Sequence, residues 1–291
     1  ELTGETKRFS FDTSDELQGM YKSVSYACAK NESRPILTGV FHRFEKNRLE
    51  VMATDSHRVA VSRSHEDDLK FPDSNLTAVV PESTVTSIIK LLNKREDDKV
   101  TVTISSNAVS YELDNVKVTS QQLEGNYPNL DRLLPDGDLE NKVNIPVSVL
   151  QDAAAFVSMF DNESNKRLVI KIIPEYGQLR ISSVKGERGA YTNDTMITRN
   201  PDADKLSMLS NFEYIKSALT KFTEHDEITL HYSNHLRPFL ILDKRLGSDM
   251  NIDLILPIRS EDHDDDFEIE DFKGEETFNP IEQILNSISS H

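Results

Sequence analysis

The same order of polar and apolar segments occurs twice in this chain, with an offset of about 130 residues. In each copy a helical pattern leads through an Asn-Glu-Ser tripeptide to two apolar runs. The corresponding segments are 13–30, 31–33, 36–41 and 49–53 in the first copy, and 146–160, 162–164, 168–173 and 179–183 in the second. An internal repeat of this kind means that one folding unit is used twice, which restricts the fold more than composition does.

The later parts of the two copies also match. Each has a second helical pattern followed by a pair of alternating runs that is typical of a hairpin. In the first copy, Val79-Val80-Pro81 leads into a helix that ends near Leu92, and the hairpin is predicted at 99–104 and 108–113. In the second, the helix is predicted at 211–222 and the hairpin at 227–232 and 238–242. The chain is therefore expected to contain two tandem copies of one domain.

Each copy is predicted to be α+β, with two helices on one face of antiparallel strands. The alternation Val100-Thr-Val-Thr-Ile104 indicates a strand with one buried face, and Pro81 is typical of a first helical turn. The boundary is expected at the turn residues Pro135-Asp-Gly-Asp, which gives domains of 1–134 and 135–259. Because strand edges seek partners, edge strands of the two copies are expected to pair in one continuous sheet.

The net charge of −17 is concentrated at the C-terminal end of the chain. Residues 260–291 contain 11 acidic residues and one basic residue, so the remaining body carries −7. An acidic body excludes tight nonspecific binding of nucleic acid by the whole surface, although a local basic lining is still compatible with it. We predict that 260–291 is a solvated and flexible tail.

No enzyme site is predicted. Asp55, Ser56 and His57 are adjacent, but a hydrolytic triad needs convergence in space, and Ser56 lacks the flanking glycines of a nucleophile elbow. There is no phosphate-binding glycine loop, no metal-like histidine spacing and no cofactor motif. Cys28, the single cysteine, lies in an apolar helical pattern and is expected in a reduced core. No apolar run approaches the roughly 18 residues of a membrane span.

Four motifs make the sequence similar to a known family. They are Arg34–Val40 followed by Leu49–Ala60, Val79-Val-Pro81, Glu124–Pro135, and Leu254–Arg259. In this order they resemble the second and third domains of bacterial sliding clamps, the DNA polymerase III beta subunits. The resemblance covers about residues 8–259 and implies a non-catalytic, cytoplasmic and nucleoid-associated processivity factor that encircles duplex DNA.

That family has three such domains per subunit, and two subunits close a ring of six domains. Here the sequence contains two copies, so it is either a fragment or a naturally short chain, and three such chains could also supply six domains. We expect a monomer or a non-native association. A competing interpretation is a regulatory or decoy module that binds partner peptides without encircling DNA.

The resemblance implies a groove between the two copies that binds short peptides of polymerases, clamp loaders and repair proteins. The residues implied in it are Leu37, Thr54, Ser56, His57, Arg58, Val59, Pro128, Arg132, Leu133, Asn211, Tyr214, Leu254, Leu256, Pro257, Ile258 and Arg259. Such pockets are concave and apolar with a few polar anchors. For each aliphatic residue, ordinary core packing is the alternative. Ser56 occupies a position that is small and glycine-like in some relatives.

DNA is expected to pass along the helices, where basic side chains would contact phosphates weakly and allow sliding. The predicted residues are Lys22, Lys30, Arg34, Lys90, Lys94, Lys216 and Lys221, and a solvated helix face is the alternative for each. In the tail, Glu282-Gln-Ile-Leu285 faintly resembles a partner peptide, so the tail is a hypothetical occupant of the groove.

Overall fold

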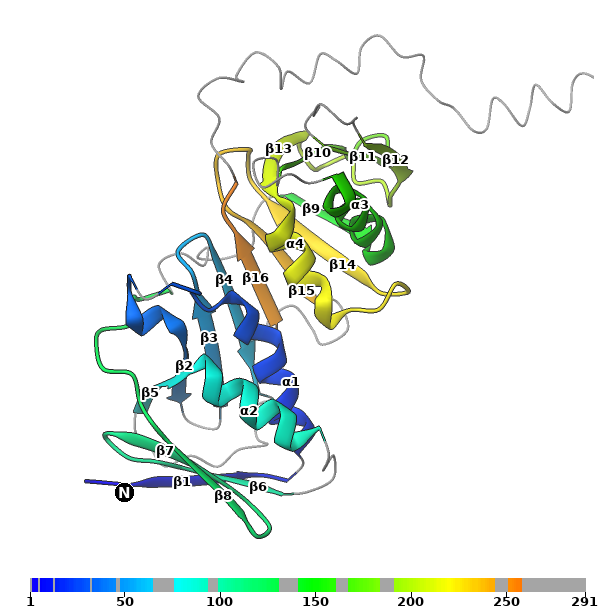
Figure 1. Ribbon diagram of the computed structural model, residues 1–291. Coiled ribbons are helices and arrows are strands. Elements are labelled where there is room, and N and C mark those ends of the chain that lie inside the picture. Colours follow the sequence, from blue (N-terminus) through cyan, green and yellow to red (C-terminus); the bar gives the residue numbers. More distant parts are fainter. Residues whose placement is uncertain are drawn as a thin grey trace, which may run out of the picture. The chain divides into compact units, whose positions relative to one another are not determined.

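A computed structural model describes most of the chain (Figure 1). The described residues are 2–4, 6–12, 14–31, 33–45, 48–64, 76–93, 99–130, 141–160, 167–183, 191–243 and 251–257. Residues 1–258 form one compact unit. The predicted boundary at 134/135 and the predicted flexible tail lie outside the described residues.

The first copy begins with a strand and a helix and ends with a three-stranded meander (Figure 1). Its elements are β1 (Lys7–Phe11), α1 (Ser14–Val24), η1 (Ser25–Ala27), η2 (Pro35–Thr38), β2 (Gly39–Glu45), β3 (Arg48–Thr54), β4 (Arg58–Arg63), β5 (Leu76–Pro81), α2 (Glu82–Leu92), β6 (Val100–Ile104), β7 (Ala108–Leu113) and β8 (Val116–Gln121).

The second copy repeats this order. Its elements are β9 (Asn141–Pro146), α3 (Val147–Phe160), β10 (Arg167–Ile173), β11 (Gln178–Ser183), β12 (Thr192–Met196), β13 (Leu206–Asn211), α4 (Phe212–Ala218), η3 (Leu219–Lys221), β14 (Glu227–Tyr232), β15 (Phe239–Asp243) and β16 (Asn251–Ile255). Two tandem α+β copies are therefore confirmed.

Some elements differ from the sequence prediction. The helix predicted over 13–30 ends at Val24, and the short 3-10 turn η1 follows, after which Cys28 is extended at φ −62° and ψ 144°. Likewise the helix predicted over 211–222 divides into α4 and η3. The strands β1, β4, β5, β8, β9, β12, β13 and β16 had not been predicted. For β8 and β12 the reason is that they have few apolar residues and their burial only alternates between half-buried and exposed.

The two copies share one sheet. Its strand order is β5-β2-β3-β4-β16-β15-β14-β9, and two four-stranded sheets, β1-β6-β7-β8 and β12-β11-β10-β13, complete the described part. Antiparallel pairing of β4 with β16 joins the copies, with Val59 opposite Leu254 and Ala60 opposite Asp253. The expected continuous sheet is thus confirmed, and we call the β4–β16 junction the seam.

Each copy has its own apolar core between its helices and its sheets. In the first, α1 and α2 lie side by side and contribute Leu17 and Ile88, while Phe11 and Tyr111 come from the four-stranded sheet. Cys28 belongs to this core and is 1% exposed, as predicted. Because these side chains are buried between the helices and the sheets, their burial stabilises each copy.

A cross-strand ion pair occurs at the corresponding place in both copies, with the charges exchanged. In the first, Nε of Arg63 lies 2.6 Å from Oε2 of Glu50, across the β3–β4 pairing. In the second, Nε of Arg180 lies 2.6 Å from Oδ1 of Asp194, across the β11–β12 pairing. The repeat therefore preserves the cross-strand attraction and not the identity of the residues.

Candidate functional site

The turn between β3 and β4 places the most specific sequence motif at the seam. Thr54 Oγ1 donates a hydrogen bond to the Arg58 carbonyl at 2.6 Å and accepts one from the Ser56 amide at 3.1 Å. Asp55 Oδ1 accepts from the amides of His57 (3.0 Å) and Arg58 (3.2 Å). Ser56 has φ +78°, in the left-handed region where glycine has least strain. This conformation suits the glycine-like character of the position.

Arg58 is held from three sides. Its Nε donates to Asp55 Oδ2 at 3.0 Å, and its Nη2 donates to the Tyr26 carbonyl at 2.8 Å. Its guanidinium carbon lies 4.8 Å from the ring centroid of Tyr214 and 5.4 Å from that of Tyr26. A planar cation between aromatic rings is a favourable arrangement, so one orientation of Arg58 is strongly preferred.

His57 and Tyr214 form the exposed edge of this arrangement. Their rings are stacked, with centroids 6.2 Å apart and planes 15° apart. Tyr214 lies on α4, whose start is capped by Asn211, because Asn211 Oδ1 accepts a hydrogen bond from the Glu213 amide at 3.0 Å. Burial, followed by the negative charge of Asp55, raises the pKa of Tyr214, whereas Arg58 acts against this increase. The Leu256 amide donates to the His57 carbonyl at 3.0 Å and continues the seam beyond β16.

One face of the seam is apolar. Val59, Leu254 and Leu130 are each at most 3% exposed, and Leu256 packs against them. The cluster also contains Met52, Val61, Leu240, Leu242, Ile252, Phe41 and Tyr127. Since its members come from both copies and from the segment before residue 131, this face exists only when the copies are joined.

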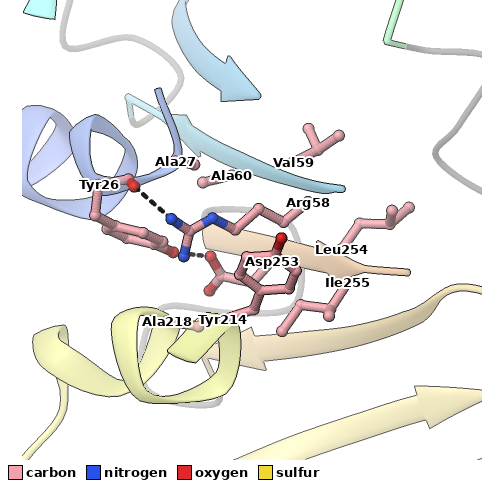
Figure 2. A pocket seen from close by; sticks show the side chains of 10 residues that line it. All are labelled: Tyr26, Ala27, Arg58, Val59, Ala60, Tyr214, Ala218, Asp253, Leu254 and Ile255. Carbon is pink, nitrogen blue, oxygen red and sulfur yellow. Dashed lines mark hydrogen bonds between the residues drawn. The ribbon is translucent and has the colours of Figure 1, made fainter. Parts of the chain in front are cut away.

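On the opposite face of the seam, the side chains of Tyr26, Arg58, Tyr214 and Asp253 lie close together (Figure 2). Asp253 is 2% exposed and accepts a hydrogen bond from the Tyr26 hydroxyl at Oδ1, while the Lys221 ammonium lies 2.5 Å from its Oδ2. The crevice between these side chains is too narrow to admit a water molecule. Burial raises the pKa of Asp253, and Lys221 and then Tyr26 oppose this shift.

The structure brings together most of the residues predicted for the groove. Around the seam it gathers Thr54, Ser56, His57, Arg58, Val59, Asn211, Tyr214, Leu254 and Leu256. Pro257 is half-buried just after Leu256 and Pro128 is exposed, whereas Leu37 is buried in η2 and its carbonyl accepts a hydrogen bond from the Ala29 amide. Arg132, Leu133, Ile258 and Arg259 lie outside the described residues.

The residues predicted to face DNA divide into two groups. Lys22, Lys30, Arg34, Lys90 and Lys216 are exposed, with Lys22 near Gln18 and Asn93. The structure instead directs Lys221 into the seam, where its side chain is 8% exposed and paired with Asp253, so its charge is not available to phosphates. Lys94 lies outside the described residues.

Sequence reasoning missed Tyr26, Asp253 and Leu130. A charged residue within the apolar run of β16 was a usable signal for Asp253, because a lone buried carboxylate needs partners. Asp55 had been considered for a triad, but its oxygens accept from the amides of His57 and Arg58 and from the Arg58 guanidinium. These hydrogen bonds stabilise a turn and do not form a proton relay.

None of the helices described is long and apolar enough to cross a membrane. Among the described residues, no group of three or more His, Cys, Asp or Glu side chains is placed to hold a metal ion.

The sequence of this chain is similar to that of a known protein family. Residues 13–129 match the family described as DNA polymerase III beta subunit, central domain. The beta sliding clamp of Staphylococcus aureus is 29% identical over 244 residues, which cover 84% of this chain and 62% of the relative, and that of Staphylococcus epidermidis is 28% identical over the same length. The chain therefore spans less than two thirds of the curated relatives it matches.

Solved structures agree with these matches. A Bacillus subtilis DNA polymerase sliding clamp has a TM-score of 0.78 at 25% identity, covering 89% of this chain and 66% of that one. A Pseudomonas aeruginosa sliding clamp has a TM-score of 0.79 at 21% identity, covering 89% and 68%. The fold is that of the DNA sliding clamps. More particularly, the chain is similar to the bacterial DNA polymerase III beta subunits, and residues 13–129, in its first copy, match their central domain, as predicted.

Proposed function

We propose that this chain is a non-catalytic sliding-clamp component that binds short peptide segments of replication and repair proteins at the seam. One observation supports this proposal above all: the β4–β16 pairing sets Val59 and Leu254 beside Leu256, with Arg58 and Tyr214 at the edge. An apolar surface with a few fixed polar and aromatic anchors suits a peptide that has a polar residue followed by apolar ones.

Fluorescence anisotropy of a labelled Gln-Leu-x-Leu-Phe peptide, titrated with the full chain, tests this function. Leu256→Ser should weaken binding at least about tenfold, because it removes an apolar wall of the surface. Met196→Ser is the matched control, since Met196 is 49% exposed on β12, which belongs to the separate sheet β12-β11-β10-β13. Equal affinity of the two variants, or no saturable binding by the unchanged chain, would refute peptide binding at this surface.

The exposed lysines of the helices support a second component, the passage of duplex DNA along the helix layer within an assembled ring. Lys22, Lys90 and Lys216 each lie in the last turn of their helix and are exposed. Contacts this few would bind phosphates weakly and without sequence preference, as sliding requires.

Duplex binding at low salt separates the ring component from the decoy alternative. A 30-base-pair duplex should be bound weakly, and Lys22→Ala with Lys90→Ala and Lys216→Ala should reduce the slope of log affinity against log salt by up to roughly 0.9 per lost contact. A chain that binds the peptide but shows no affinity for the duplex would favour the regulatory or decoy module.

A further inference from the structure

The buried side of the seam contains a carboxylate whose partners come from both copies. Asp253 accepts from the Tyr26 hydroxyl, which belongs to η1 of the first copy. It also pairs with the ammonium of Lys221, at the end of η3 in the second copy. Burying a carboxylate is costly unless both oxygens find donors, so this cluster forms correctly only when the copies are in register.

Tyr26 connects this cluster to the candidate peptide surface, by which we mean Val59, Leu254 and Leu256 with Arg58 and Tyr214 at the edge. Its hydroxyl contacts Asp253, while its carbonyl accepts from Arg58 Nη2 at 2.8 Å and its ring lies 5.4 Å from the guanidinium carbon (Figure 2). Arg58 in turn lies against Tyr214, which stacks with His57. A continuous set of contacts therefore runs from Asp253, on one face of the sheet, to the exposed aromatic edge.

We propose that Tyr26, Asp253 and Lys221 are positioning residues that hold Arg58 in the orientation that binds a partner peptide. This inference depends on the proposed function. Arginine has many rotamers, and fixing it before binding reduces the conformational entropy lost in the complex. Apolar residues at these positions would fill the seam at a lower desolvation cost, so stability alone does not account for a buried ionic cluster there.

The orientation of Arg58 can be observed without a peptide. In a ¹H–¹⁵N spectrum of the full chain, the Arg58 Nε–H signal is assigned by its loss in Arg58→Lys. Tyr26→Phe removes the hydroxyl that contacts Asp253 but retains the ring and the carbonyl that contact Arg58. We expect this signal to shift and its hydrogen exchange to accelerate at least about tenfold in Tyr26→Phe, because this change releases Tyr26 from Asp253. Asp253→Asn removes the negative charge that pairs with Lys221 and should change the signal in the same direction.

Glu50→Gln is the matched control, because Glu50 is a buried carboxylate in the same sheet that pairs with Arg63 and Arg43 instead. It should leave the Arg58 signal unchanged. If Tyr26→Phe folds normally and the signal keeps its position and exchange rate, the proposal is overturned. If Asp253→Asn does not fold, Tyr26→Phe alone decides the question.

A double-mutant cycle measures the consequence for binding. With the labelled Gln-Leu-x-Leu-Phe peptide, Asp253→Asn should weaken affinity roughly threefold to tenfold, and it should have no further effect in an Arg58→Ala background. An equal loss in both backgrounds would mean that Asp253 does not act through Arg58, which overturns the proposal. If the unchanged chain binds no peptide, the proposed function fails, while the Arg58 signal still decides whether these residues position the side chain.

Discussion

The guanidinium carbon of Arg58 lies 4.8 Å from the ring centroid of Tyr214, so a strand of the first copy and a helix of the second meet in one contact. Tyr214 also stacks with His57, the neighbour of Arg58 in the turn. Both copies therefore contribute residues to the edge of the candidate peptide surface, and this edge is intact only when the copies are joined.

Tyr214→Ala should reduce peptide affinity roughly tenfold, because it removes the ring that contacts both Arg58 and His57, a loss of about 1–2 kcal/mol of binding free energy. Tyr214→Phe keeps the ring and should bind nearly as the unchanged chain does. Peptide anisotropy measures both variants. Similar losses for alanine and phenylalanine would show that the hydroxyl, not the ring, matters.

Ser56→Gly should raise the free energy of unfolding by roughly 0.5–1 kcal/mol, because glycine adopts φ +78° without a Cβ penalty. The same chemical change at Ser87, an exposed position inside α2, should lower it by a similar amount. Urea denaturation gives both values. A lower midpoint for Ser56→Gly would contradict the strain inferred at this turn.

Because His42 is buried as a neutral imidazole, the free energy of unfolding should decrease as the pH falls. Its Nδ1–H donates to the Val40 carbonyl and its Nε2 accepts from the Tyr21 hydroxyl, which also contacts the Tyr111 hydroxyl at 2.7 Å. Burial lowers the pKa of His42 from 6.5 to about 4. A depressed folded-state pKa means that the stabilisation is complete above pH 6.5 and is lost as the pH falls towards about 4.

The loss over that window should be about 3 kcal/mol, measured by urea denaturation at a series of pH values. His42→Gln should flatten the curve between these limits. His225→Gln, at an exposed imidazole, is the control and should leave the slope unchanged. An identical pH dependence in the His42 variant would contradict the assignment.

Single and double changes at the Lys221–Asp253 pair should be non-additive. The two side chains are 8% and 3% exposed, so Lys221→Met or Asp253→Asn alone leaves an uncompensated polar or charged group and should cost about 3–5 kcal/mol of unfolding free energy. The double variant should recover most of this loss. Chemical denaturation measures the cycle, and simple additivity would rule out a direct charge pair.

Substitution by alanine should change the stability of the protein in opposite directions at two glycines. At Gly39 an added Cβ would lie 2.8 Å from the Val80 carbonyl oxygen and 2.7 Å from a Leu123 methyl, so the β2–β5 pairing must shift, at a cost of about 1–3 kcal/mol. At Gly19, inside α1, no atom lies within 4 Å of that position, and alanine should add up to about 1 kcal/mol. Thermal unfolding would contradict the packing around Gly39 if both variants gained stability.

Much of the fold was predictable because it is specified locally. The 130-residue repeat and the alternation in β6 correctly predicted two α+β copies with antiparallel strands. The motif containing His57 and Arg58, through the resemblance, indicated residues that the structure places in the turn at the seam. By contrast, β8 and β12 were missed, since strands with few apolar residues and no fully buried face lack the signal on which a sequence prediction depends.

The sequence by itself therefore determined the repeat, the class of fold and the resemblance to sliding clamps, because periodicity and motif order are properties of the linear sequence. Only the tertiary structure decided that Tyr26 meets Asp253, 227 residues away, and that Lys221 turns into the seam and not towards solvent. Such contacts depend on the register of β4 against β16. A slip of one residue would move Asp253 to the opposite face of the sheet and separate it from both partners.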